Sequence, residues 1–392
     1  MSNQSKLLFM TVALLALSAC MGPRDVTTLP PRLTPASFAD MTPYKTDKDL
    51  SGFKTAMLRS CDLFAKRPAT AVMKPAGTPG EWRPFCDDLS RADDAEIKGV
   101  IETHLRPYRV TLSGRNDGLF TGYYEPTLRA SRTKGGIYQT PVRGRPLDHV
   151  VVDAGAFRPD LKGVRLTGQL TGTPGDYTLI PYPDRAGIGK GKIPPNADRV
   201  LAWAADSADV FFLDIQGSGK LLMEDGSIMH VGYHERNGQK YTALGKVMAD
   251  RGLIPKDQVS MQTIKAYLST HPNQAPALMN ENASAVFFRE ITGDGPIGAS
   301  GLALIPGRSL AVDPRFWSYG LPVFIDAENP GRMPDGPRFS KLMVAQDTGG
   351  AIRGAIRGDV FWGDGADAAH TAGLMQSRGM MWILLPRTVQ VP

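Results

Sequence analysis

Two carboxylates, Asp347 and Asp359, lie in the stretch of this 392-residue chain that is best suited to chemistry. Asp347 follows an apolar run, 342–344, that should be a buried strand, and a glycine pair typical of a turn comes directly after it. Residues 352–362 then alternate with the period of two that is typical of a strand, which brings Asp359 back toward Asp347. The small residues of this strand, with Trp362 alongside, favour close approach by a ligand such as a sugar chain.

The same residues also permit an interpretation without chemistry. Asp359 shares its strand face with Arg353 and Arg357, and a surface ion pair of this kind contributes little to stability. An aspartate beside a glycine turn is often a turn former. The stretch by itself therefore suggests a carbohydrate site without establishing one.

The first twenty residues predict export from the cytoplasm. Lys6 precedes an apolar run, 7–17, that is too short for a stable membrane span and is typical of a signal peptide. Cys20 follows small residues, as in the lipobox of bacterial lipoproteins, so 1–19 should be removed and Cys20 should carry the lipid anchor. A secretory signal with a chance cysteine is the alternative. Met21 is compatible with sorting to the outer membrane, facing the periplasm.

Composition favours a folded body behind a tether. Residues 20–45 are rich in Pro and Thr and predict a flexible tether, and the remainder is long enough for two domains. The net charge of +6 suits an anionic polymer such as a cell-wall glycan. Export and the lack of a Lys/Arg tract argue against nucleic acid. Cys61 and Cys86 remain as an even pair that is compatible with a disulfide or with free thiols.

The N-terminal half of the body predicts helices followed by a strand. Apolar spacing predicts a helix over 50–66, and Ser90 with Asp93 predicts a capping box that opens a second helix. The run 118–126 predicts a strand on which Tyr123 and Tyr124 point to opposite faces. Glu125 in the same run is a further carboxylate that could take part in chemistry.

The middle of the chain changes in character. Residues 128–207 are dense in Pro and Gly between short apolar segments, which predicts a small β-barrel or sandwich. The apolar run 210–219 predicts a strand that ends in a glycine turn. His230 and His234 are four apart, but Val231 stands where a metalloprotease helix requires Glu, so no metal site is predicted.

The C-terminal part predicts an all-β barrel with few helices. Helices are expected at 241–254, 260–270 and 366–377, and strands at 285–289, 299–305, 309–313, 321–325 and 380–385.

Taken together, these segments resemble the membrane-bound lytic murein transglycosylase A family. The resemblance rests on G-Y-Y-E-P at 122–126, F-F-L-D-I-Q-G-S-G at 211–219, N-G-Q-K-Y at 237–241, V-F-F-R at 286–289 and the C-terminal region. That region, about 285–387, is similar to the 3D domain, whose three aspartates would be Asp313, Asp347 and Asp359.

The resemblance implies a mainly β fold with a few helices. A discontinuous double-psi β-barrel would comprise 46–127 and 208–392, and a smaller β-barrel would be inserted at 128–207. A glycan strand of peptidoglycan would lie in the groove between the two.

The resemblance also implies lytic transglycosylase activity, which cleaves the β-1,4 bond between N-acetylmuramic acid and N-acetylglucosamine without water and leaves a 1,6-anhydro end. Asp347 would be the single acid/base, and Asp359 would tune it or stabilise the oxocarbenium-like charge. Asp313 would be mainly structural at the edge of the substrate site. The remaining sugar-binding candidates are Tyr123, Tyr124, Gln216 and Trp362. No cofactor or metal is implied.

Two alternatives belong to other functional classes. The same barrel occurs in non-catalytic wall-loosening proteins of the expansin kind, which would make the chain a glycan-binding module. A hydrolase that uses both Asp347 and Asp359 with water is the other alternative. Protein partners, with cell-wall synthesis and division proteins as candidates, are left open by the sequence.

Overall fold

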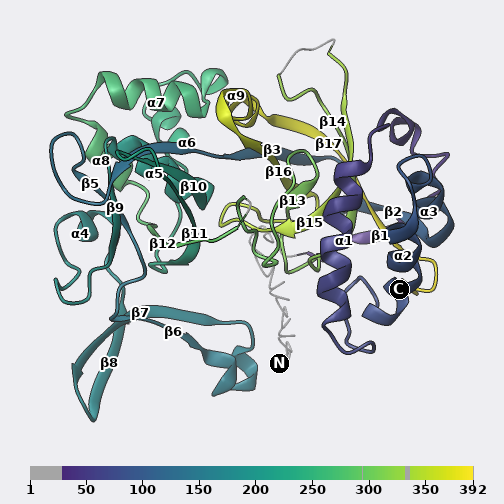
Figure 1. The fold of residues 1–392 in the computed structure, drawn as a ribbon, viewed down its shortest axis with the longest axis horizontal. Coiled ribbons are helices and arrows are strands. Elements are labelled where there is room, and N and C mark those ends of the chain that lie inside the picture. Colours follow the sequence, from purple (N-terminus) through teal and green to yellow (C-terminus); the bar gives the residue numbers. More distant parts are fainter. Residues whose placement is uncertain (1–28, 294, 332–335, 392) are drawn as a thin grey trace, which may run out of the picture.

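β-Strands dominate this computed structural model, which describes residues 29–293, 295–331 and 336–391. The predicted signal peptide, Cys20 and the first part of the predicted tether lie outside the described residues. The strands form three sheets and the helices lie around them (Figure 1). The mainly β class with a few helices is therefore confirmed. Within the described ranges, no helix is both long and apolar enough to cross a membrane.

The first sheet combines strands from the two ends of the described chain. They are β1 (Arg32–Pro35), β2 (Leu105–Thr111), β3 (Gly118–Glu125), β13 (Ser309–Ala311), β14 (Pro322–Ala327), β15 (Phe339–Asp347), β16 (Arg357–Asp364) and β17 (Gln376–Pro386). Their order is β1-β2-β17-β14-β15-β13-β16-β3, and β17 also pairs with β3. Six of them, β17, β14, β15, β13, β16 and β3, therefore close into a barrel.

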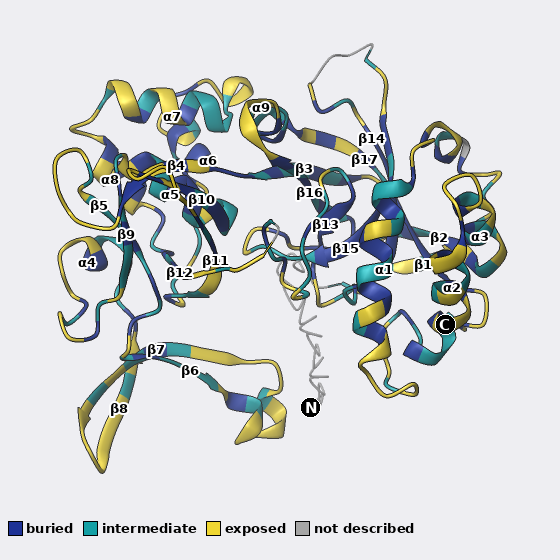
Figure 2. Cartoon of the chain, in the orientation of Figure 1, coloured by how far each residue is buried: buried dark blue, intermediate teal, exposed yellow. Residues whose placement is uncertain are grey.

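The barrel is held by continuous apolar runs. Every residue of β14 is buried, as are 342–346 of β15 and 381–386 of β17. Such runs are typical of strands that are covered on both faces. The barrel appears in Figure 2 as the dark blue centre of its half of the molecule. Three helices pack around it: α1 (Ser51–Ala65), α2 (Pro79–Arg91) and α3 (Ile97–His104).

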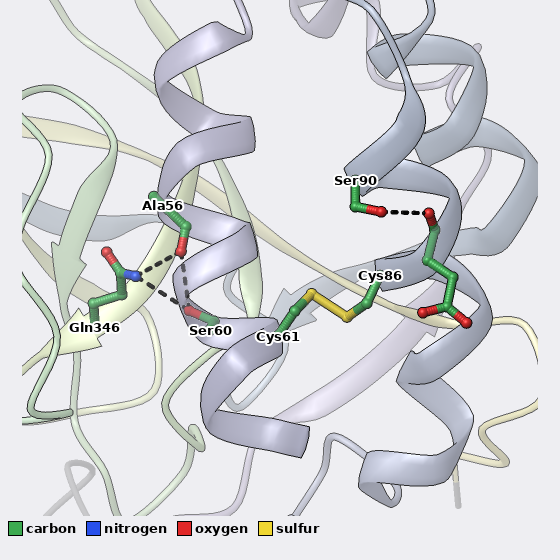
Figure 3. Close-up of a disulfide and its surroundings, with 7 residues drawn as sticks. Ala56, Ser60, Cys61, Cys86, Ser90 and Gln346 are labelled. Atoms are coloured by element: carbon green, nitrogen blue, oxygen red, sulfur yellow. Dashed lines mark hydrogen bonds between the residues drawn. A yellow bond between two sulfur atoms is a disulfide. The ribbon is translucent and has the colours of Figure 1, made fainter. Parts of the chain in front are cut away.

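A disulfide joins the first two of these helices. Cys61 of α1 and Cys86 of α2 are bonded, with 5.8 Å between their Cα atoms (Figure 3). Next to Cys61, the Ser60 hydroxyl accepts a hydrogen bond of 3.1 Å from the amide of Gln346, which also donates to the Ala56 carbonyl. Because Gln346 precedes Asp347, the cross-linked helices buttress the end of β15.

The predicted capping box at Ser90 is wrong. Ser90 lies in the last turn of α2, and its hydroxyl donates to the Asp87 carbonyl at 2.7 Å (Figure 3). The Asp93 carboxylate instead accepts from the Ala95 and Glu96 amides, and Glu96 accepts from the Asp93 amide. These bonds close the turn at 93–96 that leads into α3, which begins at Ile97.

The second sheet is built from the middle of the chain, Thr127 to Glu290, within which the third sheet is inserted. Its strands are β4 (Thr127–Ser131), β5 (Thr140–Arg143), β9 (Val200–Ala204), β10 (Ser218–Met223), β11 (Ile228–Arg236) and β12 (Val286–Glu290). Their order is β12-β11-β10-β4-β9-β5, and a bridge between Gly144 and Phe288 brings the two edge strands together.

This pairing does not follow the predicted boundary at residue 207. Strands β10, β11 and β12 pair with the second sheet, although the sequence assigned them to the first barrel. The dense Pro and Gly content ends near 207, whereas the core of the second sheet continues through Leu221, Val231 and Phe288. The change in composition marks a change in turn density and not the edge of the sheet.

A third, three-stranded sheet extends away from the rest of the molecule (Figure 1). It consists of β6 (His149–Asp153), β7 (Arg165–Thr173) and β8 (Asp176–Pro181), paired in that order. Figure 2 shows β8 exposed over most of its length.

The predicted strand at 210–219 is wrong. The segment forms a helix, α5 (Ser207–Gln216), and only Ser218 and Gly219 enter β10. The Asp206 carboxylate accepts from the Ala208 amide at the N-terminus, and Gly217 ends the helix with φ +80°. These caps fix a helix despite the strand preference of its Val and Phe residues, because glycine adopts the left-handed conformation that a helix end requires.

The predicted strand at 299–305 is also wrong. The segment is a loop with one bridge, between Ile297 and Ala303, and its turns and glycines prevent a longer ladder. The remaining helices are α4 (Arg185–Gly189), α6 (Leu244–Asp250), α7 (Met261–Thr270), α8 (Ala275–Asn280) and α9 (Gly365–Leu374).

Candidate active site

Four residues form a row across four strands of the barrel. Asp347 of β15 pairs with Ala311 of β13, Ala311 pairs on its other side with Asp359 of β16, and Asp359 pairs with Thr121 of β3. Directly paired residues share one face of a sheet. The two aspartates therefore face the same side with only the methyl group of Ala311 between them, and their backbones are about 10 Å apart, two strand spacings.

A β-bulge places Asp347 in this row. The pairing of β13 with β15 skips one residue, so Leu310 lies opposite Ala345 and Ala311 lies opposite Asp347. The skipped residue is Gln346, which is fully buried and bonded to α1 and to the Ser309 hydroxyl. The bulge turns Gln346 toward the helices and aims Asp347 toward the site, a common use of bulges.

Asp347 is half-buried, and both of its carboxyl oxygens accept hydrogen bonds. The Ala299 amide donates to Oδ1 at 2.8 Å, and the Tyr123 hydroxyl donates to Oδ2 at 2.8 Å. Burial raises the pKa of Asp347 to about 6, against the lowering effect of these hydrogen bonds, and the charge of Asp359 adds a smaller increase. A carboxyl with this pKa is poised for proton transfer near neutral pH.

Asp359 has different surroundings. The Thr121 hydroxyl donates to its Oδ1, and Arg357 donates to the Thr121 oxygen at 2.8 Å. Burial raises the pKa of Asp359, but the Arg357 charge and the Thr121 hydrogen bond oppose the increase. A cation beside Asp359 favours its ionised form, so the two aspartates are suited to different roles.

Asp313 anchors a loop and does not join the row. Its carboxylate is fully buried and accepts from the Gly354 amide at 2.8 Å and from the Arg315 guanidinium at 2.6 Å. Burial raises the pKa of Asp313, but the hydrogen bonds from Arg315 and Gly354 outweigh it and hold the pKa below its ordinary value. This arrangement is that of a structural residue.

The sugar-binding candidates Tyr123 and Tyr124 lie on β3, and Gln216 lies at the end of α5. Tyr123 is buried and packs on Phe361, with 5.3 Å between ring centroids. The Tyr124 amide donates to Gln216 Oε1 at 3.0 Å, so Gln216 joins the end of α5 to β3. Tyr123 therefore contacts Asp347 directly, whereas Tyr124 points to the opposite face of β3 and only its backbone amide bonds to Gln216.

Trp362 does not belong to this group. Asp359 and Phe361 share one face of β16, and Trp362 lies on the other, packed against Phe339 with 5.4 Å between centroids. A Cβ atom at Gly122 would lie 2.6 Å from Trp362 Nε1, so the absence of a side chain at Gly122 leaves room for the indole. The prediction that Trp362 lies alongside the aspartates is therefore wrong.

A pocket of about 220 Å³ opens beside Gln216, between α5, α6 and α7. Its lining is mostly apolar and includes Phe212, Ile215 and Tyr241. Burial raises the pKa of the Tyr241 phenol, and the charge of Asp359 adds to the increase, so Tyr241 interacts electrostatically with this aspartate. Sequence reasoning did not select Tyr241, although it ends the N-G-Q-K-Y segment on which the resemblance partly rests.

The described residues give no sign of a metal centre, since no group of three or more His, Cys, Asp or Glu among them is arranged to hold an ion.

Comparison with known proteins identifies the family of this chain. Residues 119–289 match the MltA specific insert domain, and residues 308–385 match the 3D domain. A membrane-bound lytic murein transglycosylase from Agrobacterium tumefaciens has a solved structure that superposes with a TM-score of 0.79 and 32% identity, covering 91% of this chain and 98% of that one. This chain belongs to the membrane-bound lytic murein transglycosylase A family.

Two further members support the assignment. MltA from Neisseria gonorrhoeae superposes with a TM-score of 0.75 and 28% identity, covering 92% of this chain and 94% of that one. Membrane-bound lytic murein transglycosylase A from Escherichia coli K12 is 32% identical over 271 residues, which are 68% of this chain. The match spans 65% of the length of the E. coli member of the family.

Proposed function

We propose that this protein is a lytic transglycosylase of peptidoglycan, and that Asp347 is its single acid/base. One observation carries the proposal: a half-buried carboxyl with a pKa near 6 faces the same side of the barrel as a second, cation-supported carboxyl. Membership in a family whose members are named lytic murein transglycosylases supports the substrate class.

The proposed reaction needs one proton donor that acts twice. Protonated Asp347 gives its proton to O4 of the leaving N-acetylglucosamine as the C1–O4 bond breaks. The 6-hydroxyl of the N-acetylmuramic acid then attacks C1 and forms the C1–O6 bond, and its proton returns to the Asp347 carboxylate. No water is consumed, and the product is a 1,6-anhydro sugar.

Asp359 is proposed to stabilise the positive charge that develops at C1. Burial raises the pKa of Asp359, and the Arg357 charge and the Thr121 hydrogen bond oppose that increase and so favour its ionised form. Preorganised charge of this kind is often a large contribution to catalysis. Tyr123, Tyr124 and Gln216 are proposed to line the sugar-binding groove.

The proposed setting is the periplasmic face of the outer membrane. Residues 1–19 are the proposed signal peptide and Cys20 the proposed lipid anchor, followed by a tether to about residue 45. The double-psi connection of the first barrel and the binding of the glycan strand between the two sheets are part of the same proposal. The names of the relatives, which describe them as membrane-bound, support the anchoring.

The test is mass spectrometry of muropeptides released from purified sacculi. The wild type should release anhydro products, and Asp347→Asn should lower their rate about 10²–10⁴-fold, the usual contribution of a general acid. Asp367→Asn, which removes an exposed carboxylate from α9, is the matched control and should behave as wild type. Products with reducing ends would identify a hydrolase instead. Binding to sacculi without any release would identify a glycan-binding module.

A further inference from the structure

Four charged side chains meet where the two large sheets join. Glu125 and Asp364 are register partners at the ends of β3 and β16 in the first sheet. Lys220 and His230 are register partners on β10 and β11 in the second sheet. An acidic pair on one sheet thus faces a basic pair on the other.

The contacts between these pairs are centred on Lys220. Its ammonium group donates to Asp364 and lies 3.7 Å from Glu125 Oε2. His230 Nδ1 lies 3.7 Å from Glu125 Oε1, and both of these atoms are buried without a hydrogen-bond partner. Glu125 itself is 2% exposed, so its charge depends on the two basic residues of the other sheet.

The cluster lies at the point where the chain crosses from one sheet to the other. Only Pro126 separates β3 from β4, and Lys220 pairs directly with Thr127 at the start of β4. Two other contacts span the same junction: the Tyr124 amide donates to Gln216, and Gln262 of α7 donates to the Ala369 carbonyl of α9 at 3.0 Å.

The strands that end in the acidic pair also carry the candidate active site. Thr121 and Tyr123 lie on β3, and Asp359 lies on β16. Gln216 and Tyr241 belong to segments attached to the second sheet. The angle between the sheets at the cluster therefore sets how Gln216 and Tyr241 stand relative to the aspartates.

We infer that Lys220 is a positioning residue that clamps the paired ends of β3 and β16 to the second sheet and fixes the binding groups opposite the aspartates. The expected change in KM rests on the proposed function, whereas the expected change in hydrogen exchange does not. Without the ammonium group, Glu125 and Asp364 are two adjacent carboxylates that repel each other, and the sheets lose their central ionic contact.

The experiment compares Lys220→Met with wild type in two measurements. Hydrogen exchange followed by mass spectrometry should become faster at residues 124–127 and in α7, which border the junction. Kinetics on soluble, uncross-linked glycan strands should show KM raised about tenfold with kcat within a factor of three, because the binding groups shift while Asp347 keeps its surroundings.

Two further variants separate the clamp from a general loss of packing. Lys246→Met removes an exposed lysine that pairs only with Asp250 along α6, and it should behave as wild type. The double variant Lys220→Met/Asp364→Asn removes the repulsion together with the clamp, and it should restore much of the KM and the slow exchange. Asp364 precedes α9 but makes no capping hydrogen bond through its side chain, so this change leaves the helix start intact.

The inference would be overturned if Lys220→Met had the same hydrogen-exchange rates and the same KM as the wild type. A double variant more impaired than the single one would also overturn it, because the defect would then be lost packing. Failure of the proposed function would look different: wild type would release no anhydro product, while the exchange measurement would still report on the clamp.

Discussion

Replacing Tyr123 with phenylalanine should move the pH profile of the reaction toward higher pH. The Tyr123 hydroxyl donates to Asp347 Oδ2 at 2.8 Å, and this hydrogen bond lowers a pKa that burial has raised to about 6. An acid must be protonated to act, so the wild-type kcat/KM should fall above about pH 6. Loss of the hydrogen bond destabilises the carboxylate and raises the pKa further.

The size of the effect follows from the hydrogen bond. A hydrogen bond to a charged group contributes about 1.5–3 kcal/mol, and about 1.4 kcal/mol corresponds to one pH unit. Ala299 continues to donate to Oδ1, and solvent reaches the half-buried carboxyl, so the lower end of that range applies. The pKa of Asp347 in Tyr123→Phe should therefore be about one pH unit higher, and the protonated fraction at pH 7 should be about fivefold larger.

The assay is the initial rate of anhydromuropeptide release from sacculi between pH 4.5 and 8.5. Tyr267→Phe is the matched control, because its hydroxyl donates to Gln274, which lies directly before α8. The absolute rate of Tyr123→Phe can change in either direction, but the midpoint of the alkaline limb reports the acid alone. An unchanged midpoint, or one that moves to lower pH, would refute the role given to Asp347 and its contact with Tyr123.

Three other predictions concern stability. Asp347→Asn should increase the free energy of unfolding by about 1–2 kcal/mol at pH 7.5 and by little at pH 4. The reason is that the Asp347 carboxyl binds its proton more tightly in the folded chain than in the unfolded chain. Wild type therefore loses stability as the pH rises from about 4 to about 6. Thermal melts at both pH values test this, and equal shifts would contradict it. Asp313→Asn should lower the free energy of unfolding by about 2–3 kcal/mol at pH 7, because hydrogen bonds from Arg315 and Gly354 are lost. In thermal melts below about pH 4 the difference from wild type should become smaller, because the pKa of Asp313 is lowered in the folded chain. Replacing both Cys61 and Cys86 with serine should lower the free energy of unfolding in urea by about 3 kcal/mol, as expected for a disulfide that closes a loop of 25 residues. Adding a reductant to the wild type should produce the same loss.

Local patterns in the sequence were sufficient for much of the barrel. The buried run before Asp347 lies in β15, a turn follows it, and Asp359 returns on β16, although this strand begins at Arg357 and the predicted part at 352–356 is a loop. The alternation of Tyr123 and Tyr124 on β3 is also confirmed, with Tyr123 buried and Tyr124 partly exposed. These features depend on period and on turn chemistry, which neighbouring residues determine.

The position of Trp362 also follows from the local period of β16. Asp359 and Trp362 are separated by an odd number of positions, and in a strand such residues point to opposite faces. The period of two that predicted the strand was therefore sufficient to exclude Trp362 from the site.

Other features depended on contacts that no local pattern contains. The helix α5 is not among these features, because its capping residues Asp206 and Gly217 lie directly at its two ends and are local helix signals that outweigh the strand propensity of its apolar run. The bulge that aims Asp347 depends on Gln346 finding partners on α1. The nearness of Tyr241 to Asp359 and the meeting of Glu125 with His230 both follow from sheet pairing across long stretches of chain.

The way the chain crosses between the sheets also dictates an order of folding. The second sheet uses only residues from Thr127 to Glu290, so it can complete itself while five strands of the first sheet, β13 to β17, are still missing. The first barrel closes only when β17 pairs with β3, and such long-range pairing is slow. Before β13, β15 and β16 are in place, Asp347 and Asp359 have no row to occupy. The candidate active site therefore forms after the second sheet has all of its strands, and a chain interrupted after Glu290 would carry those strands but no acid in place.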